Sequence, residues 1–538
     1  MTMKRLVRLC AASGAELTGG IRASDEADID VKLLRCEGAV MRRFDLHILC
    51  LFLALASCSS HPEIPEVSSS VDALPSIFPD YTDVTVPSNI APLNFMLADS
   101  AYFEMVAVFE SARGTKRVYG KEGKVMVPED EWRQLRDESI GTNIKVEVFC
   151  QRKTNLQWVG FRQFAINIAD EPIDDYVSYR LIEPSYAIYN RMLIAQRQMS
   201  SFDESEIFNN MVTGNNRNGQ CINCHSYQNY DTDNMMFHVR VLNGGTVIVV
   251  DGKPRKVNLK RKNTISAGVY PSWHPTQRLI AFSTNQTHQY FHTFDKNKVE
   301  VFDTESDLIL YDIERDSVII VANDPDRLEV FPTWSPDGKG LYYCAAPVQV
   351  VNSEDYRSDY EKLRYNLYYR AFDPSTLNFG KEDTVYVADT SCRSVSLPRV
   401  SPDGHFIAFA EGGYGCFNIW HHDADIKVMS LDACSASGSQ PRFVDAAGLN
   451  SKHYAESYPS WSSNGHWIMC ASRRDDGNYS RIYISYFDGE KIHKAFELPQ
   501  EDPQQNIMRL KSYNRPEFMK EPVKVSLMEF ARTVEERD

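Results

Sequence analysis

Five consecutive residues, Cys221-Ile222-Asn223-Cys224-His225, carry the most specific chemistry in the sequence. Two thiols at this spacing can add to the two vinyl groups of a haem, and the imidazole that follows can bind the iron. Three other interpretations compete. A zinc site needs a second pair of ligands nearby, a thioredoxin-like dithiol needs a βαβ setting, and a structural disulfide leaves His225 without a role. We therefore expect covalent haem c on Cys221 and Cys224, with His225 as the proximal ligand of the iron.

The second axial ligand of such an iron is not specified by the motif. Met235, Met236 and His238 follow His225 closely in the sequence and are the distal candidates. Three further methionines precede the motif at helical spacing, where methionine is more often a core residue than a ligand: Met192, Met199 and Met211. A bound Met or His favours electron transfer, whereas an open iron position would allow chemistry on a bound molecule.

The segment 41–58 is typical of an export signal. Two arginines precede an apolar stretch of about ten residues, which is too short to span a bilayer but suits a signal peptide. The stretch ends Leu-Ala-Ser-Cys at 55–58, which resembles a bacterial lipobox. In that pattern Cys58 is lipidated and becomes the mature N-terminus. A secretory signal with a chance cysteine is the alternative.

Residues 1–40 fit neither a signal nor a domain, so Met41 is the expected start and 1–57 the expected removed segment. Residues 58–91 are rich in Ser and Pro, which predicts a tether between a lipid anchor and the first domain. No later stretch is long and apolar enough to span a membrane as a helix. The expected location is the cell envelope of a Gram-negative bacterium, anchored on the periplasmic side, with the outer membrane favoured.

Four related segments divide the C-terminal half of the chain. They share a proline, a turn and an apolar strand, and their prolines are Pro271, Pro332, Pro398 and Pro459, at spacings of 61, 66 and 61 residues. The Pro-Asp-Gly turns at 336–338 and 402–404 are tight, because Pro fixes φ and Gly accepts positive φ. Strand–turn–strand units of this kind cannot bury their faces alone and must stack on one another.

These segments resemble the WD40-like repeats of TolB-type β-propellers over residues 237–500. The resemblance implies a propeller of six blades, although only four are visible in the sequence, and it places Trp273, Trp334 and Trp461 between blades. The whole chain resembles a family of Gram-negative lipoproteins in which a c-type haem motif precedes a TolB-like propeller. No activity follows from that resemblance.

The remaining segments complete a mainly β architecture. Residues 92–183 alternate apolar and polar side chains, with one short helix near 128–135, and predict a β-sandwich-like domain. Residues 184–236 have helical spacing and predict a helical connector that carries the haem motif. Residues 501–538 are a C-terminal tail that could close or pack on the propeller.

Composition excludes one class of partner. Lys and Arg total 58 against 73 Asp and Glu, a net charge of −15, which argues against general binding of nucleic acid. Three functions from different classes remain. The first is an anchored electron-transfer protein whose propeller docks envelope or redox partner proteins. The second is a binding scaffold in the envelope, with Cys221 and Cys224 as a structural pair. The third is an enzyme with an open haem iron or an active propeller site.

Overall fold

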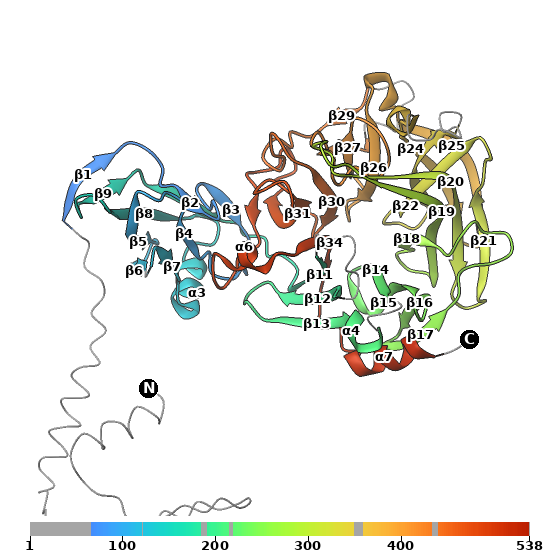
Figure 1. Ribbon diagram of the computed structural model, residues 1–538, viewed down its shortest axis with the longest axis horizontal. Coiled ribbons are helices and arrows are strands. Elements are labelled where there is room, and N and C mark those ends of the chain that lie inside the picture. The colour runs from blue at the N-terminus through green and yellow to red at the C-terminus, as the bar shows by residue number, and fades with distance from the viewer. Residues whose placement is uncertain are drawn as a thin grey trace, which may run out of the picture. The chain divides into compact units, whose positions relative to one another are not determined.

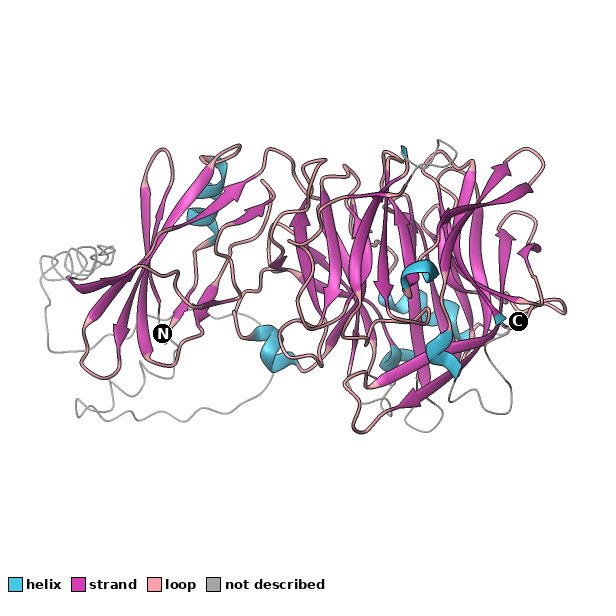
Figure 2. Ribbon diagram, turned by 90° about the horizontal axis from the view of Figure 1, so that it is seen from above, coloured by secondary structure: helices cyan, strands magenta, loops and turns pink. Residues whose placement is uncertain are grey.

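The computed structural model describes residues 66–120, 122–183, 191–214, 219–348, 359–432 and 440–536. All of them belong to one compact unit, 61–538. The signal segment and Cys58 lie outside the described residues. Strands make up most of the chain and helices are few and short (Figure 2). The mainly β fold class predicted from the sequence is confirmed.

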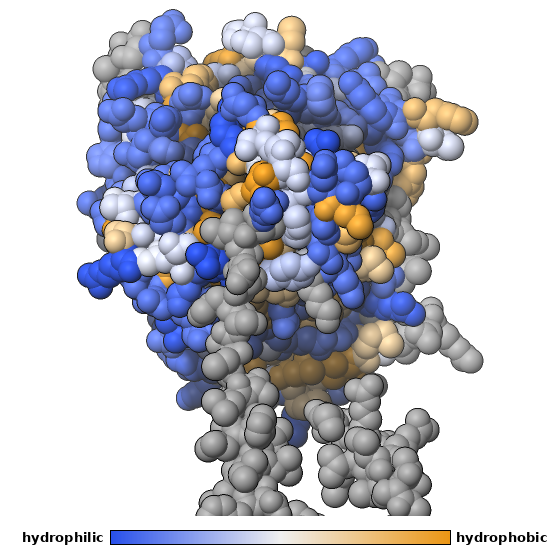
Figure 3. Space-filling model, turned by 90° about the vertical axis from the view of Figure 1, so that its left-hand side faces the viewer, coloured by the Kyte–Doolittle hydropathy of each residue, from blue (hydrophilic) through white to orange (hydrophobic). Residues whose placement is uncertain are grey.

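The N-terminal domain consists of two sheets and one helix. The larger sheet contains β1 (Val67–Val71), β3 (Val84–Val86), β5 (Tyr102–Glu110), β6 (Thr115–Gly120), β8 (Asn143–Arg152), β9 (Trp158–Phe161) and β10 (Phe164–Ile168). The smaller sheet contains β2 (Ile77–Phe78), β4 (Phe95–Leu97) and β7 (Lys124–Val125), and the helix is α3 (Glu129–Asp137). Phe95 of the smaller sheet contacts Phe109 of the larger one, with ring centroids 6.5 Å apart. The outer face of this domain is largely hydrophilic, with only scattered apolar residues (Figure 3).

The described part of the predicted tether, 66–91, belongs to this domain instead. Strand β3 pairs in parallel with β10, and both Val84 and Val86 are completely buried. The Ser and Pro content suggested a linker, but apolar residues at every second position of β3 fill the core. The sequence prediction of a tether through residue 91 is therefore wrong for 66–91.

Six four-stranded blades form a β-propeller; four of them are separate sheets, and the third and fourth are joined into one eight-stranded sheet by the pairing of β20 with β22. The first blade contains β34 (Ser512–Met519), β11 (Tyr176–Ile182), β12 (Leu193–Gln198) and β13 (Glu204–Asn209). The second contains β14 (Gln220–Gln228), β15 (Asp231–Val241), β16 (Gly245–Val250) and β17 (Lys253–Val257). The third contains β18 (Val269–Trp273), β19 (Leu279–Phe291), β20 (Val299–Asp312) and β21 (Ser317–Ala322).

The other three blades follow in chain order. The fourth contains β22 (Arg327–Trp334), β23 (Gly340–Pro347), β24 (Asn366–Asp373) and β25 (Asn378–Tyr386). The fifth contains β26 (Ser394–Val400), β27 (Phe406–Gly412), β28 (Asp425–Ser430) and β29 (Arg442–Phe443). The sixth contains β30 (Glu456–Trp461), β31 (Trp467–Ser472), β32 (Arg481–Tyr486) and β33 (Phe496–Glu497). Helices α4 (Asn210–Thr213), α6 (Gln505–Arg509) and α7 (Leu527–Glu535) complete the fold.

The propeller closes through its C-terminal strand. Strand β34 pairs with β11, more than 300 residues earlier in the chain, and supplies the innermost strand of the first blade (Figure 1). Each inner strand contacts the inner strands of both neighbouring blades, so that β34, β14, β18, β22, β26 and β30 form a closed ring. The propeller therefore begins at β11, earlier than the predicted 237, and ends at β34, later than the predicted 500.

One residue of each inner strand adopts a left-handed backbone conformation at a β-bulge. These residues occupy equivalent places, with φ between 50° and 54°: Cys224, Tyr270, Phe331, Leu397, Tyr458 and Arg515. The pairing register shifts here in every blade. In five blades the next residue is a proline, and in the second blade it is His225. The Cys-x-x-Cys-His segment is thus the sixth copy of the blade repeat.

This placement differs from the helical connector predicted for 184–236. The described residues of that range form strands β12, β13, β14 and the start of β15, and the one helix among them, α4, is four residues long. Met192 and Ile194 are both completely buried, as expected for residues two apart on one face of a strand. The apolar residues of this segment therefore follow the two-residue period of a strand. Over so few residues, that period is hard to distinguish from the period of a helix.

The tryptophans of the repeat lie between blades, as predicted. Trp334 Nε1 donates to the backbone oxygen of Ser272 in the preceding blade at 3.1 Å, and Trp461 Nε1 donates to that of Arg399 at 3.2 Å. Val400 takes the tryptophan position in the fifth blade and Tyr227 takes it in the second. These bonds fix neighbouring blades to one another near the axis.

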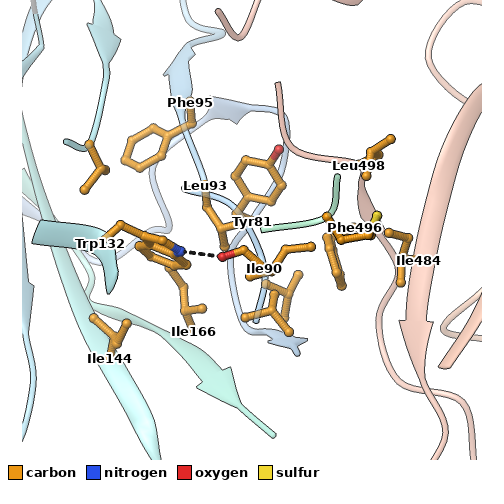
Figure 4. Packing of buried hydrophobic residues seen from close by; sticks show 14 of the residues in the cluster. Tyr81, Ile90, Leu93, Phe95, Trp132, Ile144, Ile166, Ile484, Phe496 and Leu498 are labelled. Carbon is orange, nitrogen blue, oxygen red and sulfur yellow. Dashed lines mark hydrogen bonds between the residues drawn. The ribbon is translucent and has the colours of Figure 1, made fainter. Parts of the chain in front are cut away.

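A single hydrophobic core joins the N-terminal domain to the sixth blade. Tyr81, Leu93 and Trp132 of the domain pack in the same cluster as Phe496 and Leu498 of the blade (Figure 4). Trp132 Nε1 donates to the backbone oxygen of Ile90 at 2.9 Å, and the Tyr81 hydroxyl donates to that of Glu497 at 3.4 Å. The two parts are therefore packed as one body in this region.

Substitution Phe496→Ala is expected to lower the free energy of unfolding of the full chain by about 3–5 kcal/mol, because Phe496 is completely buried in this shared core. Urea unfolding followed by circular dichroism measures the loss. The matched control is Phe294→Ala, since the Phe294 side chain is 99% exposed and its removal should change the value by less than about 0.5 kcal/mol. A loss for Phe496→Ala as small as that of the control would contradict a shared core.

Candidate functional site

Strand β14 places the Cys-x-x-Cys-His segment on the central channel of the propeller. Cys221 pairs with Arg240 and Asn223 pairs with His238 on the adjacent strand β15. Cys224 then occupies the left-handed position of the β-bulge. At this bulge the direction in which the side chains of the strand point changes relative to the channel. Neither thiol is in a disulfide.

The channel contains a series of cavities along its axis. A small cavity of 40 Å³ lies at the bulge residues and the prolines that follow them, including Tyr270, Pro271, Arg515 and Pro516. A cavity of 320 Å³ is lined by residues further along the inner strands, such as Trp273 and Trp334. The third and largest cavity, of 680 Å³, is lined by residues before the prolines. The ring of prolines therefore separates two mouths of the channel.

Both thiols open on the mouth that precedes the prolines. Cys224 lines the cavity of 680 Å³, and Cys221 lines an adjoining cavity of 390 Å³. The two cavities share wall residues that include Arg180, Asn223 and Arg240, so they adjoin one another, and we call the two together the thiol cavity. Burial raises the pKa of the Cys221 thiol, while the nearby Arg180 and Arg240 guanidinium groups act in the opposite direction.

His225 does not line the thiol cavity. Its side chain is 1% exposed, it contacts the Tyr227 ring, and neither of its ring nitrogens makes a hydrogen bond of normal geometry with a described residue. Burial holds the pKa of His225 well below its usual value, and the positive charges of Arg515 and Arg180 lower it further. The ring is therefore neutral and enclosed among blades. His225 as the proximal iron ligand stays a prediction.

His238 lies on the wall of the thiol cavity beside Cys224. Its Nδ1 lies 2.8 Å from the Thr246 hydroxyl oxygen, and its Nε2 is buried without a hydrogen-bond partner among the described residues. Burial holds the pKa of His238 well below its usual value, so the imidazole is neutral. A ring fixed through one nitrogen and free at the other is the arrangement that metal-ligating histidines have.

The methionine candidates are placed differently. Met235 and Met236 are completely buried in two hydrophobic clusters and do not line the thiol cavity. Met192 lines the part of the cavity next to Cys221, although its side chain is also buried in a core cluster. Met199 lies in the core that joins the N-terminal domain to the propeller, and Met211 is 52% exposed. Of the three distal candidates, the structure brings only His238 to the thiols.

A long hairpin, β19–β20, forms one wall of the thiol cavity. Gln289 and Val301 of this hairpin line both parts of the cavity. The hairpin extends from the third blade toward the fifth (Figure 1) and is fixed there by a buried network. Glu300 accepts a hydrogen bond from the Tyr414 hydroxyl at 2.7 Å and pairs with His421 at 2.8 Å. The hairpin thereby limits the access of solvent to the thiols.

Sequence reasoning did not find the arginines of this mouth. Arg180 comes from β11, Arg240 from β15 and Arg515 from β34, so no local pattern connects them.

The described residues contain no group of three or more His, Cys, Asp or Glu side chains that could hold a metal ion. No helix in the described part of the chain has the length and apolar character needed to cross a membrane.

Comparisons with known proteins find distant structural neighbours only. No protein-family model matches the chain, and no characterised protein matches its sequence. A puromycin hydrolase is 11% identical over 60% of this chain and 45% of its own length, with a TM-score of 0.35. The tricorn protease is 14% identical over 68% of this chain and 34% of its own, with a TM-score of 0.33.

The propeller domain of the Trilobed protease from Pyrococcus furiosus is 10% identical over 50% of this chain and 71% of its own length, with a TM-score of 0.28. The chain spans less than half the length of the puromycin hydrolase and of the tricorn protease. Because all these TM-scores lie below 0.5, the six-bladed architecture rests on the sheet topology of the chain itself.

The position of His225 leads to a stability prediction. The other five blades have proline at this place with the same left-handed residue before it, so His225→Pro is compatible with the backbone. The substitution removes two buried nitrogens that make no hydrogen bond of normal geometry with the described residues, and we expect the free energy of unfolding to stay equal or to rise by about 1–3 kcal/mol.

Urea unfolding of the full chain checks this expectation. The reciprocal substitution Pro271→His in the third blade is the matched control, since it introduces a buried imidazole at the equivalent place and should lower the free energy of unfolding. A marked loss of stability in His225→Pro would show instead that His225 has a polar partner that the fold requires.

Proposed function

We propose that this chain is a c-type haem protein of the bacterial envelope, which carries a covalent haem at one mouth of its propeller channel and transfers electrons. The single observation that supports the proposal most is the placement of two free thiols, Cys221 and Cys224, on two adjoining cavities at one mouth of the channel. The volumes of the two cavities, 680 and 390 Å³, fall in the range of cofactor sites, roughly 300–1,000 Å³.

The walls of the thiol cavity suit a haem in three respects. Val239, Val301 and Phe417 give an apolar surface for the macrocycle. Arg180 and Arg240 give positive charge for its two carboxylates. His238 offers an unpartnered Nε2 that could bind the iron. His225 would have to leave its buried position to do so, which makes His238 the better placed imidazole.

A haem bound in this way would supply a reversible one-electron couple. The chain's own residues determine the conditions of the transfer. The β19–β20 hairpin limits the water around the site, and the apolar wall favours the less charged state of the iron. His238, held through Thr246, would be a ligand of the iron. A redox partner protein would dock at this mouth or on the adjoining face of the propeller.

The proposal includes an envelope location. The segment 41–58 supports export and lipidation of Cys58, and haem is attached to Cys-x-x-Cys-His sequences outside the cytoplasm. Cys58 and the segment before it lie outside the described part of the chain, so this element of the proposal rests on the sequence.

The test is the retention of haem by the denatured chain. We expect the full chain, made in cells that contain haem-maturation machinery, to keep a haem-dependent peroxidase stain at its own position on a denaturing gel. A chain that is folded and exported but gives no stain would overturn the proposal.

A further inference from the structure

The mouth that contains the thiols is positively charged in an acidic protein. The chain has a net charge of −15, yet the described residues that line the cavity of 680 Å³ include Arg180, Arg240, Lys260 and Arg515 and no Asp or Glu. The adjoining cavity has one carboxylate, Glu183, which lies 3.7 Å from Arg191. The positive charge at this mouth is therefore not balanced by its own walls.

The arginines differ in the hydrogen bonds and ion pairs that they already make within the protein. Arg515 pairs with Glu517 at 3.1 Å and also donates to the backbone oxygen of Pro271. Arg180 donates to the Ile222 backbone and to Asn223, both neutral acceptors, and its Nε is buried without a partner. Arg180 is thus a buried cation without a counter-ion in direct contact among the described residues.

Arg240 is the arginine of this mouth whose side chain is least engaged. Its side chain makes no hydrogen bond or ion pair with the described residues, although its backbone belongs to the β14–β15 pairing. It sits opposite Cys221 in the pairing of β14 with β15, and both cavities include it in their walls. The Arg240 side chain is exposed at the mouth, and a guanidinium group is suited to carboxylates because it can donate two parallel hydrogen bonds.

We infer that Arg180 and Arg240 form a carboxylate-binding site beside the thiols, which takes a ligand with two carboxylate groups. The inference deepens the proposed function, and rests on it for one of two sources: the carboxylates are the propionates of an attached haem, or they belong to a free dicarboxylate. Both sources share the same recognition by Arg240, whose side chain supports no contact that the fold needs.

The experiment uses the full chain made without haem-maturation machinery, and therefore free of covalent haem. It is titrated with haem, with the dimethyl ester of haem and with succinate, and binding is followed by absorbance or calorimetry. We expect haem to bind at least about tenfold more tightly than its ester, and Arg240→Gln to remove that preference while leaving the affinity for the ester unchanged. Arg442→Gln, an exposed arginine on β29, is the matched control and should change nothing.

The outcomes separate the two sources and the two proposals. Saturable binding of succinate that Arg240→Gln weakens about tenfold, without a preference for haem over its ester, would support the site and assign it to a free dicarboxylate. Equal affinity of the wild type and Arg240→Gln for every anionic ligand would overturn the inference. Failure of the wild type to bind both haem and succinate would overturn it as well. Arg180→Lys keeps the positive charge but loses the two parallel donors of the guanidinium group. It should weaken the binding of the same ligands. Covalent haem on the denatured chain is scored separately, so haem attached without any dependence on Arg240 would overturn only the carboxylate site.

Discussion

Removal of residues 512–536 is expected to leave the chain without a folded propeller. The deleted segment contains β34, which is the innermost strand of the first blade, and α7, whose Phe530 and Val534 are completely buried. Without β34 the inner edge of β11 is open and the ring of inner strands is interrupted. Each lost core residue costs about 2–5 kcal/mol, and the sum exceeds the stability of an ordinary domain, about 5–15 kcal/mol.

Circular dichroism and limited proteolysis of the truncated chain measure this effect. The expected result is a non-cooperative thermal profile and cleavage within the blades. Removal of 537–538 alone is the control and should leave the wild-type melting curve unchanged. A truncated chain that melts cooperatively at the wild-type temperature would show that the first blade closes without β34.

The second large effect is on haem attachment. The double substitution Cys221→Ala/Cys224→Ala is expected to abolish covalent haem, because no other thiol lines the thiol cavity among the described residues. Each single substitution should leave one thioether bond and one free vinyl group, with an absorption band shifted from that of the wild type.

The control for the cysteine substitutions is Cys392→Ala, since Cys392 is an exposed free thiol on the fourth-to-fifth blade connection. It should keep the full haem content. If the double variant retained as much covalent haem as this control, another attachment site would have to exist and the thiol cavity would lose its assigned role.

The propeller could be predicted from the sequence because its repeat contains residues with strict backbone requirements. The turns at 336–338 and 402–404 need Pro and a glycine with positive φ, and Gly338 and Gly404 have φ of 68° and 78°. The tryptophans pack between blades because a large side chain with one donor suits the carbonyl of the preceding blade. Four blades could therefore be recognised from local sequence alone.

The other two blades could not, since their repeat residues are substituted. In the second blade His225 and Tyr227 replace Pro and Trp, so the segment has the sequence of a haem motif and not of a blade. In the first blade Arg515-Pro516-Glu517-Phe518 keeps the proline, but it lies at the C-terminus, far from its partner strands. Pairing between such distant segments leaves no periodic signal in either one.

The candidate site was predicted in part. The thiols were identified by their spacing, and His238 by its proximity in the sequence. The convergence of Arg180, Arg240 and Arg515 depends on which strands become neighbours, which the sequence does not specify. The enclosure of His225 likewise follows from the blade repeat, because the bulge places that residue where five other blades bury a proline.

The pyridine haemochrome spectrum of the full chain, purified from cells with haem-maturation machinery, tests the central claim most directly. The band of the reduced complex reports how many vinyl groups are saturated. Attachment to Cys221 and Cys224 predicts the band position of a haem with both vinyl groups saturated, in an amount that matches the protein. A spectrum without haem, or with the band of a haem whose vinyl groups are both free, would contradict it.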